Sequence, residues 1–485
     1  MRNTASALVQ KVWSYAHVLR DDGLSYLDYT EQITYLIFLK IAWETASSAQ
    51  RNSKQPQFYW GKIISSSDDT KLAQRYQEVL RKLSVSPGLL GLIFTKPQSK
   101  IEDAAKLRRL VRLVDEQQWS SLDVDVKAEI YEGLLARNAE DVRGGAGQYF
   151  TPRPIIRAIV EVMQPDPTMY ISDPACGTGG FLLAAHDYLL KTYPEMDQTT
   201  RNFIDNEAMH GNDIVASVAR LCGMNLFLHG MGAGDKVLVE ISDSLARKPA
   251  PVQMVLTNPP FGKKSSFTVI HDDGKRDTEK IYYARNDFWA TTSNKQLNFV
   301  QNVYTMLIDG GRAAMVVPDN VLFEGGAGEE IRRELLRHCD VHTVLRLPTG
   351  IWYSPGVKAN VLFFDKNGNP REPATKELWV YDLRTNKNFT LRNNPITEED
   401  LKDFVEVFHA HDRKRGRRES DRFKKLTYSE VMKRDKANLD IFWLQDDSLI
   451  HKDNLAKPEV LAAAIIKDLQ DAMTAFSEVE REISS

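Results

Sequence analysis

Four consecutive residues, Asn258, Pro259, Pro260 and Phe261, form the pattern in this sequence that is best suited to catalysis. They follow the apolar segment 253–257, which predicts a buried strand. Two prolines fix φ and supply no N–H, so a rigid turn is expected beyond the strand. The asparagine oxygen and a proline carbonyl could accept both hydrogens of an amino group on a heteroaromatic ring. Such a turn would leave the nitrogen lone pair free to react, while the phenylalanine offers a face for stacking.

A glycine-rich segment, 173–181, is the second candidate, because it lies between a predicted strand and a predicted helix. Glycine permits positive φ and close approach of the backbone to a ligand, and ligands of open α/β sheets bind at such strand ends. The spacing matches neither G-x-G-x-x-G nor G-x-x-x-x-G-K-S/T, which argues against dinucleotides and triphosphates. Taken alone, the loop could serve NAD, FAD, S-adenosylmethionine or no ligand. The candidate cofactor-binding residues in it are Asp173, Ala175, Gly177, Thr178, Gly179 and Gly180.

Acidic residues occur in succession near predicted strand ends, and each suits one part of a nucleoside cofactor. Asp173 could accept a hydrogen bond from an ammonium group, which a methionine moiety carries and a pyrophosphate does not. Asp213 could accept from both ribose hydroxyls. Asp243 could bind the adenine amine of the cofactor, with Asp235 as a rival for that role. The long spacing before the second acid implies a surface insertion around 193–208.

The elements that must position these residues change character along the chain. Apolar residues recur at helical spacing up to about residue 140, and short strand-like segments then alternate with helical ones. The predicted strands are 169–172, 253–257, 313–318, 341–347 and 357–364, and the predicted helices are 181–191, 216–228, 298–308 and 329–336. This alternation predicts an α/β fold, a mostly parallel sheet covered on both faces. The last two strands are separated by a loop too short for a helix, so they could pair antiparallel at one end of the sheet.

Three regions follow from this pattern. We expect a helical N-terminal domain at 1–140, a cofactor-binding α/β domain at 141–365, and a mixed C-terminal region at 366–485. The C-terminal region contains the basic run 411–418, for which a solvated loop is slightly favoured over a contact with DNA phosphates. It ends in a predicted helix, 458–483, whose apolar stripe suits docking on a partner as well as packing on its own body.

Composition narrows the class of protein. Hydrophobic residues make up 42% and charged residues 27% of the 485 residues, which is typical of a globular protein. The formal net charge of −3 means that any nucleic-acid contact depends on a local patch or on a partner. Three scattered cysteines give no disulfide or zinc pattern, so no metal is expected. No apolar run is long enough for a membrane span, and a cytoplasmic location is expected.

Together with a third motif, these patterns resemble a known family. The third motif precedes the glycine loop and consists of Gln148, Tyr149, Phe150, Thr151, Pro152 and Arg153. In this order the three motifs resemble the amino-methyltransferases of nucleic acids, and more closely the modification subunit of type I restriction–modification systems. The resemblance covers nearly the whole chain and implies a Rossmann-like S-adenosylmethionine-dependent methyltransferase domain.

The resemblance also implies functions for particular residues. It implies that 148–153 folds over the methionine end of the cofactor, and that 178–180 and Asp213 bind the rest. The family commonly has Glu where this chain has the shorter Asp213. The implied reaction is N6 methylation of adenine in double-stranded DNA. The implied partners are a DNA-specificity (S) subunit, two methylating copies for each one, and a restriction (R) subunit. Methylation of RNA or of protein glutamine, and a non-catalytic DNA-binding subunit, are the alternatives.

Overall fold

The computed structural model describes residues 10–12, 14–15, 26–97, 99–121, 151–262, 266–270, 276–280, 282–283, 285–352, 357–368, 371–391 and 394–445. Gln148, Tyr149 and Phe150 lie outside the described residues, and so does the predicted C-terminal helix 458–483. Within the described part of the chain, no helix combines the length and apolarity needed to cross a bilayer.

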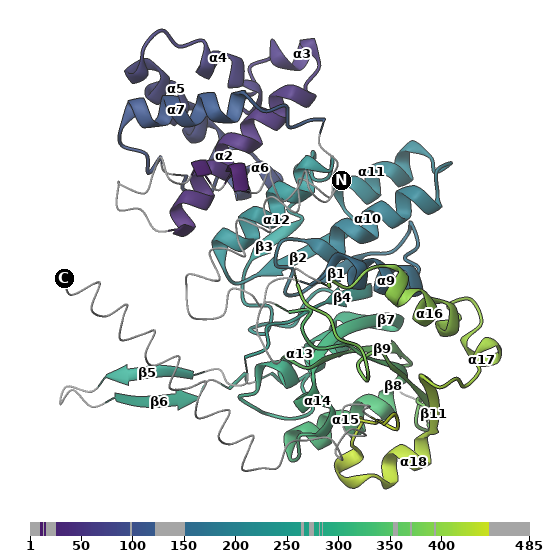
Figure 1. Ribbon diagram of the computed structural model, residues 1–485. Coiled ribbons are helices and arrows are strands. Elements are labelled where there is room, and N and C mark those ends of the chain that lie inside the picture. Colours follow the sequence, from purple (N-terminus) through teal and green to yellow (C-terminus); the bar gives the residue numbers. More distant parts are fainter. Residues whose placement is uncertain are drawn as a thin grey trace, which may run out of the picture.

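The described N-terminal part is helical, as the apolar spacing predicts. Its helices are α2 (Tyr26–Thr45), α3 (Ser48–Arg51), α4 (Trp60–Ile64), α5 (Asp69–Leu83), α6 (Gly88–Ile93) and α7 (Ala104–Asp115), with the 3-10 turn η2 (Pro56–Phe58). Side-chain N-caps define the starts of two long helices: Asp68 accepts from the amide of Lys71, and Asp103 accepts from that of Ala105. These helices gather in one group at the purple end of the ribbon (Figure 1).

The second part is built on one mixed sheet. Its strands are β1 (Ile171–Asp173), β2 (Met209–Asp213), β3 (Val239–Ile241), β4 (Val252–Thr257), β7 (Leu307–Pro318), β8 (Cys339–Arg346), β9 (Ala359–Lys366), β10 (Glu377–Asp382) and β11 (Phe423–Thr427). The order across the sheet is β11-β10-β8-β9-β7-β4-β1-β2-β3. The five adjacent strands β3, β2, β1, β4 and β7 are parallel to one another. Strand β9 is antiparallel to both its neighbours, and β11 is antiparallel to β10. The fold class predicted from the sequence is therefore confirmed.

Helices cover both faces of this sheet (Figure 1). They are α9 (Arg153–Met163), α10 (Gly180–Thr192), α11 (Gln198–Asn206), α12 (Ala216–Leu228), α13 (Lys295–Met306), α14 (Asp319–Phe323), α15 (Ala327–His338), α16 (Glu399–Phe408), α17 (Arg413–Gly416) and α18 (Tyr428–Lys433), with the turn η4 (Asp435–Ala437). Side chains alternate along β4: Met254 and Leu256 join the core that α9, α10 and α12 cover, whereas Val255 joins the core under α13 and α15. The insertion predicted around 193–208 contains α11.

One detail of the sheet differs from the prediction. The strands β8 and β9 pair antiparallel as expected, but they do not end the sheet. The later strand, β9, inserts between β7 and β8, and β10 and β11 extend the sheet further. The sheet therefore continues past residue 365, where the boundary of the α/β domain was predicted. A separate two-stranded ribbon, β5 (Ser266–Ile270) and β6 (Arg276–Lys280), follows the asparagine–proline turn and was not predicted.

The basic run 411–418 is divided between structural and exposed residues. Arg417 is 4% exposed, donates to the carbonyls of Phe408 and His342, and lies over the ring of Phe408. Arg413 forms an ion pair with Asp365 on β9. The slightly favoured interpretation as a solvated loop is therefore wrong for these two arginines, while Lys414, Arg415 and Arg418 are exposed.

Candidate functional site

The predicted motifs meet where the strand order reverses. From β1 the chain adds β2 and β3 on one side, and β4 and β7 then add on the other. In open α/β sheets, ligands bind beyond the carboxyl ends of the strands at such a switch point. Because β1 and β4 are adjacent, the glycine loop after Asp173 and the turn after Thr257 lie side by side. The hydroxyl of Thr257 donates to the Asp173 carboxylate at 2.6 Å.

The glycine loop has the backbone conformation that its composition predicts. Gly177 and Gly179 have φ of 54° and 85°, in the left-handed region that favours glycine. A Cβ on Gly179 would lie 2.9 Å from the Cys222 sulfur, and one on Gly180 would lie 2.8 Å from Ile156. The loop is closed by a bond of 2.8 Å from the Gly179 amide to the Cys176 carbonyl. Side chains are therefore excluded on the inner side of the loop, and the backbone lies close to its neighbours.

Asp173 differs from the other predicted acids because it lies beneath the loop. It is 2% exposed, and one oxygen accepts from both the Thr257 hydroxyl and the Ala175 amide. Burial raises the pKa of Asp173 to about 7. The carboxylate does not line the cavity formed by the other motifs. Its geometry is that of an anchor for the loop, and its contact with an ammonium group stays a prediction.

Asp213, Asp243 and Asn258 line one cavity, together with Ala175, Ile214 and Pro260. Asp213 ends β2 and accepts from the amides of Val215 and Gly177, so it is fixed to the glycine loop. Burial raises the pKa of Asp213 to about 6. The adjacent Ile214, an apolar residue that is 67% exposed, lines the same cavity. Sequence reasoning missed Ile214.

The structure separates the two rivals for the third acid. Asp243 lies in the same cavity as Asp213 and accepts from the Leu245 amide and from the hydroxyl of Tyr283. Asp235 is exposed, and its backbone packs beside Gly88 of α6, outside the cavity. Asp243 is therefore the acid that the fold brings to the site.

Asn258 has one satisfied and one unsatisfied polar atom. Its side-chain nitrogen donates to the Thr151 hydroxyl at 2.8 Å, which joins the third sequence motif to the catalytic turn. Its Oδ1 is buried without a hydrogen-bond partner among the described residues. A buried acceptor left unpaired costs free energy unless a ligand donates to it. This orphaned oxygen fits a site that accepts a hydrogen from an amino group.

An aromatic pair lies beside this turn. Phe261 contacts Trp352 edge to face, with ring centroids 5.4 Å apart and planes at 89°. Trp352 is 4% exposed, and its indole N–H has no partner among the described residues. It comes from the loop after β8, more than 90 positions further along the chain, so the sequence alone did not point to it. The pair provides an apolar surface at the end of the turn that begins with Asn258.

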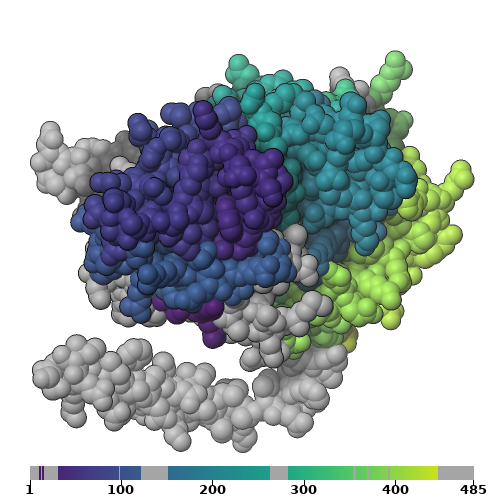
Figure 2. Space-filling view, turned by 90° about the horizontal axis from the view of Figure 1, so that it is seen from above, coloured from purple at the N-terminus to yellow at the C-terminus, as the bar shows by residue number. Residues whose placement is uncertain are grey.

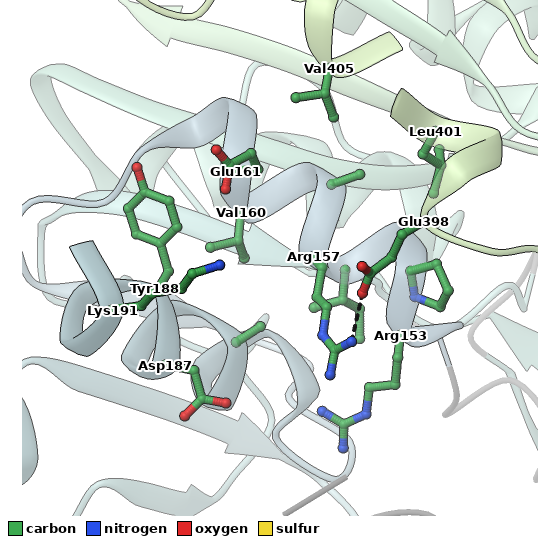
Figure 3. A pocket seen from close by; sticks show the side chains of 14 residues that line it. Arg153, Arg157, Val160, Glu161, Asp187, Tyr188, Lys191, Glu398, Leu401 and Val405 are labelled. Carbon is green, nitrogen blue, oxygen red and sulfur yellow. Dashed lines mark hydrogen bonds and ion pairs between the residues drawn. The ribbon is translucent and has the colours of Figure 1, made fainter. Parts of the chain in front are cut away.

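A second cavity lies elsewhere, between α9, α10 and α16. Figure 3 shows Arg157 of α9 facing Glu398, with which it forms an ion pair of 2.6 Å. Arg153 is the one predicted site residue that lines this groove. Since the groove contains none of the residues 173–180, 213, 243 or 258–261, it is separate from the candidate site.

A glycine loop, two acids at strand ends and an Asn-Pro-Pro-Phe turn at one switch point define a methyltransferase that acts on amino groups. Residues 122–448 match the family described as N-6 DNA Methylase, and residues 8–116 match the HsdM N-terminal domain. The chain is 34% identical to the EcoKI methylase subunit of Escherichia coli K12, over 99% of this chain and 95% of that protein. It is also 34% identical to the StySJI methylase subunit of Salmonella typhimurium, with the same coverage.

Solved structures agree with this result. The crystal structure of the EcoKI M protein aligns with a TM-score of 0.55 and 31% identity, covering 99% of this chain and 96% of that one. A structure of a type I R-M system aligns with a TM-score of 0.69 at 24% identity, which supports the fold. The chain therefore belongs to the family of type I restriction enzyme methylase subunits, the adenine-specific N6 DNA methyltransferases.

Proposed function

We propose that the cavity between Asp213, Asp243 and Asn258 binds S-adenosylmethionine, and that Asn258 presents the target adenine amine to it. The observation that carries this proposal is the buried Oδ1 of Asn258, which has no hydrogen-bond partner among the described residues and lies in a cavity with two acids at strand ends. The donor, when bound, supplies an electrophilic methyl group. The protein contributes by holding the acceptor nitrogen in line with that group.

Each wall of the cavity suits one part of the cofactor. Asp213 accepts from the ribose hydroxyls, and the exposed Ile214 covers one face of the adenine ring. Asp243 accepts from the adenine amine. The glycine loop, anchored by Asp173, lets the backbone approach the methionine portion closely. The positive φ of Gly177 and Gly179 supports this assignment, because it gives the loop a backbone conformation that favours glycine.

The acceptor side of the site is the turn and its aromatic neighbours. Oδ1 of Asn258 and the carbonyl of Pro259 accept the two amine hydrogens, which frees the nitrogen lone pair. Phe261 stacks on the target base, and Trp352 closes the pocket behind it. The target base must leave the duplex to reach this position, which costs a few kcal/mol that stacking and edge contacts offset. The proton released after transfer is weakly held, so no dedicated base is required.

The test is Asn258→Ala in the full chain, assembled with the partner subunits encoded beside it. Tritium transfer into cognate DNA should fall about a hundredfold to a thousandfold, the usual cost of removing one preorganised polar group. Binding of S-adenosylmethionine, measured by calorimetry, should change by less than about threefold because the two acids remain. Undiminished methylation by the variant would contradict the proposal.

Sequence selection is proposed to depend on partners. The net charge of −3 supplies no general attraction for DNA, so affinity must come from a local surface or another subunit. The family resemblance leads us to propose a DNA-specificity (S) subunit that binds two methylating copies, and a restriction (R) subunit that joins them. Labelled methyl transfer to duplex DNA only when the specificity subunit is present would support this arrangement. Transfer to RNA or to protein glutamine would favour the alternative substrates.

A further inference from the structure

Helix α12 lies between the N-terminal helices and the glycine loop (Figure 1). Residues at positions i, i+3 and i+7 share one face of a helix, and a shift of two positions leads to the opposite face. Arg220, Gly223 and Phe227 form one such face. Cys222 and Asn225 belong to the other. The two faces contact two different parts of the molecule.

The first face of α12 packs on the N-terminal helices. Arg220 forms an ion pair of 2.8 Å with Glu31, at 19% side-chain exposure for both. The rings of Phe227 and Phe38 lie 5.3 Å apart. A Cβ on Gly223 would lie 3.2 Å from side-chain atoms of Leu89 and Ile93 in α6. These contacts belong to one core cluster shared by both parts of the chain, and Figure 2 shows the N-terminal helices packed directly against the teal part of the surface.

The second face of α12 holds the glycine loop. Asn225, which is 2% exposed, donates its side-chain N–H to the Thr178 carbonyl at 2.9 Å. The N–H of the same peptide group, on Gly179, donates to the Cys176 carbonyl at 2.8 Å. Both ends of this peptide plane are therefore fixed, and the plane sets the φ of 85° at Gly179. The sulfur of Cys222 occupies the space that a Cβ on Gly179 would need.

We infer that Asn225 is a positioning residue for cofactor binding. In this inference α12 acts as a strut: its contacts with the N-terminal helices on one face keep the glycine loop on its other face in the binding conformation. This inference rests on the proposed cofactor site. Without the Asn225 amide, the buried Thr178 carbonyl loses its donor and the peptide plane can rotate. Cofactor affinity then falls in proportion to the fraction of molecules with a competent loop. Weakening the contacts between the opposite face of α12 and the N-terminal helices lowers the same fraction of molecules with a competent loop.

The first experiment measures S-adenosylmethionine binding by calorimetry with the full chain. Asn225→Leu should raise Kd about tenfold, the factor that corresponds to about 1.4 kcal/mol. Asn225→Gln keeps an amide donor and should recover part of the affinity. The matched control is Asn302→Leu, which removes an equally buried helical asparagine whose side chain contacts Arg285 and Met306. The control should lower thermal stability but leave Kd within about twofold, since the glycine loop keeps its contacts.

Kinetics in the assembled complex separate positioning from general damage. Asn225→Leu should raise KM for the cofactor while kcat at saturating cofactor and KM for DNA stay within about threefold, because binding of the ground state and of the transition state is weakened equally. An Asn225→Leu variant that binds like wild type while Asp213→Asn binds weakly would overturn this inference alone. If Asp213→Asn also binds like wild type, the proposed cofactor site itself is wrong.

The strut is tested by a double-mutant cycle. Gly223→Val forces side-chain atoms into α6 and should raise Kd several-fold although it lies on the face away from the loop. If Asn225→Leu and Gly223→Val both act through the glycine loop, the double variant should show a smaller increase in Kd than the product of the two single increases. A wild-type Kd for Gly223→Val, or fully multiplicative effects, would overturn the role of α12 as a strut.

Discussion

We predict that Thr151 sets the orientation of the Asn258 amide in the proposed site, and one substitution tests this prediction. The Thr151 hydroxyl accepts from the Asn258 side-chain nitrogen at 2.8 Å, and the oxygen of that amide is a buried acceptor with no partner in the part of the chain that the structure describes. An amide has two nearly isosteric orientations, and only one presents the oxygen to an amine. Thr151→Val keeps the shape of the side chain but removes the acceptor that selects the productive orientation.

The expected magnitude follows from the burial of the contact. Thr151 is 7% exposed and Asn258 is partly buried, so water is a limited replacement for the acceptor that the Asn258 N–H loses. An unsatisfied buried donor costs about 1–3 kcal/mol, and the lower half of that range applies where the amide can turn toward another acceptor. A loss of about 1.4 kcal/mol in transition-state stabilisation corresponds to about a tenfold lower rate. Thr151→Ser retains the hydroxyl and should stay within about threefold of wild type.

The assay is single-turnover methyl transfer to cognate DNA by the assembled complex at saturating cofactor. Thr151→Val should lower the rate constant about tenfold without weakening cofactor binding by more than about threefold, because the acids of the cavity are intact. If the valine and serine variants both react at the wild-type rate, the orientation argument fails. If the valine variant loses cofactor affinity instead, Thr151 acts on the loop rather than on Asn258.

Three further predictions follow from the same geometry. Because the pKa of Asp213 is about 6 and the ionised form accepts ribose hydroxyls, Kd for S-adenosylmethionine should be about tenfold weaker at pH 5 than at pH 8. Asp213→Asn should flatten this calorimetric profile, and a flat wild-type profile would contradict the assignment. Gly179→Ala should weaken cofactor binding about tenfold or more, because Gly179 has a φ of 85° and an added Cβ would lie 2.9 Å from the Cys222 sulfur. Gly230→Ala, at a φ of 83° in open space, should cost only strain of about 1–2 kcal/mol, measured by chemical denaturation. Arg417→Ala should lower the free energy of unfolding by about 2–4 kcal/mol, while exposed Arg415→Ala changes it by less than about 0.5; equal effects would show that burial does not distinguish them.

Much of the fold and the catalytic turn could be predicted because their signals are local. The apolar segment 253–257 and the two prolines after it determine a buried strand and a rigid turn within nine residues. The glycines of 177–180 likewise signal positive φ without reference to the rest of the chain. Strand order was less accessible, because the insertion of β9 between β7 and β8 depends on packing across the sheet rather than on either strand alone.

The parts that could not be predicted depend on contacts between distant positions. Trp352 reaches Phe261 from a loop that follows another strand, and Asn225 reaches Thr178 across 47 positions. Each is an ordinary residue for its own segment: an aromatic in a loop and an asparagine in a helix. Only their contacts in the fold distinguish them: Trp352 has a buried indole N–H with no partner among the described residues, and Asn225 has a buried amide that donates to a backbone carbonyl. The division of the basic run 411–418 into buried and exposed residues could not be predicted for the same reason. Only the contacts made in the fold distinguish the buried Arg417 from the exposed Arg415.

The three acids at strand ends show how position gives different functions to one residue type. In the fold, Asp173 and Asp213 end their strands, and Asp243 lies two residues after the end of β3. Asp173 accepts from a hydroxyl and an amide on one oxygen and lies under the loop, where its hydrogen bonds among the described residues anchor the backbone. Asp213 and Asp243 also accept two bonds each, but both line the cavity and keep lone pairs available to a ligand. A carboxylate has about four acceptor sites, so what separates anchor from ligand-binding acid is access to the cavity rather than the number of internal bonds. The anchor then has its own functional consequence, because the bond between Asp173 and Thr257 ties the cofactor loop to the strand that ends in the catalytic turn.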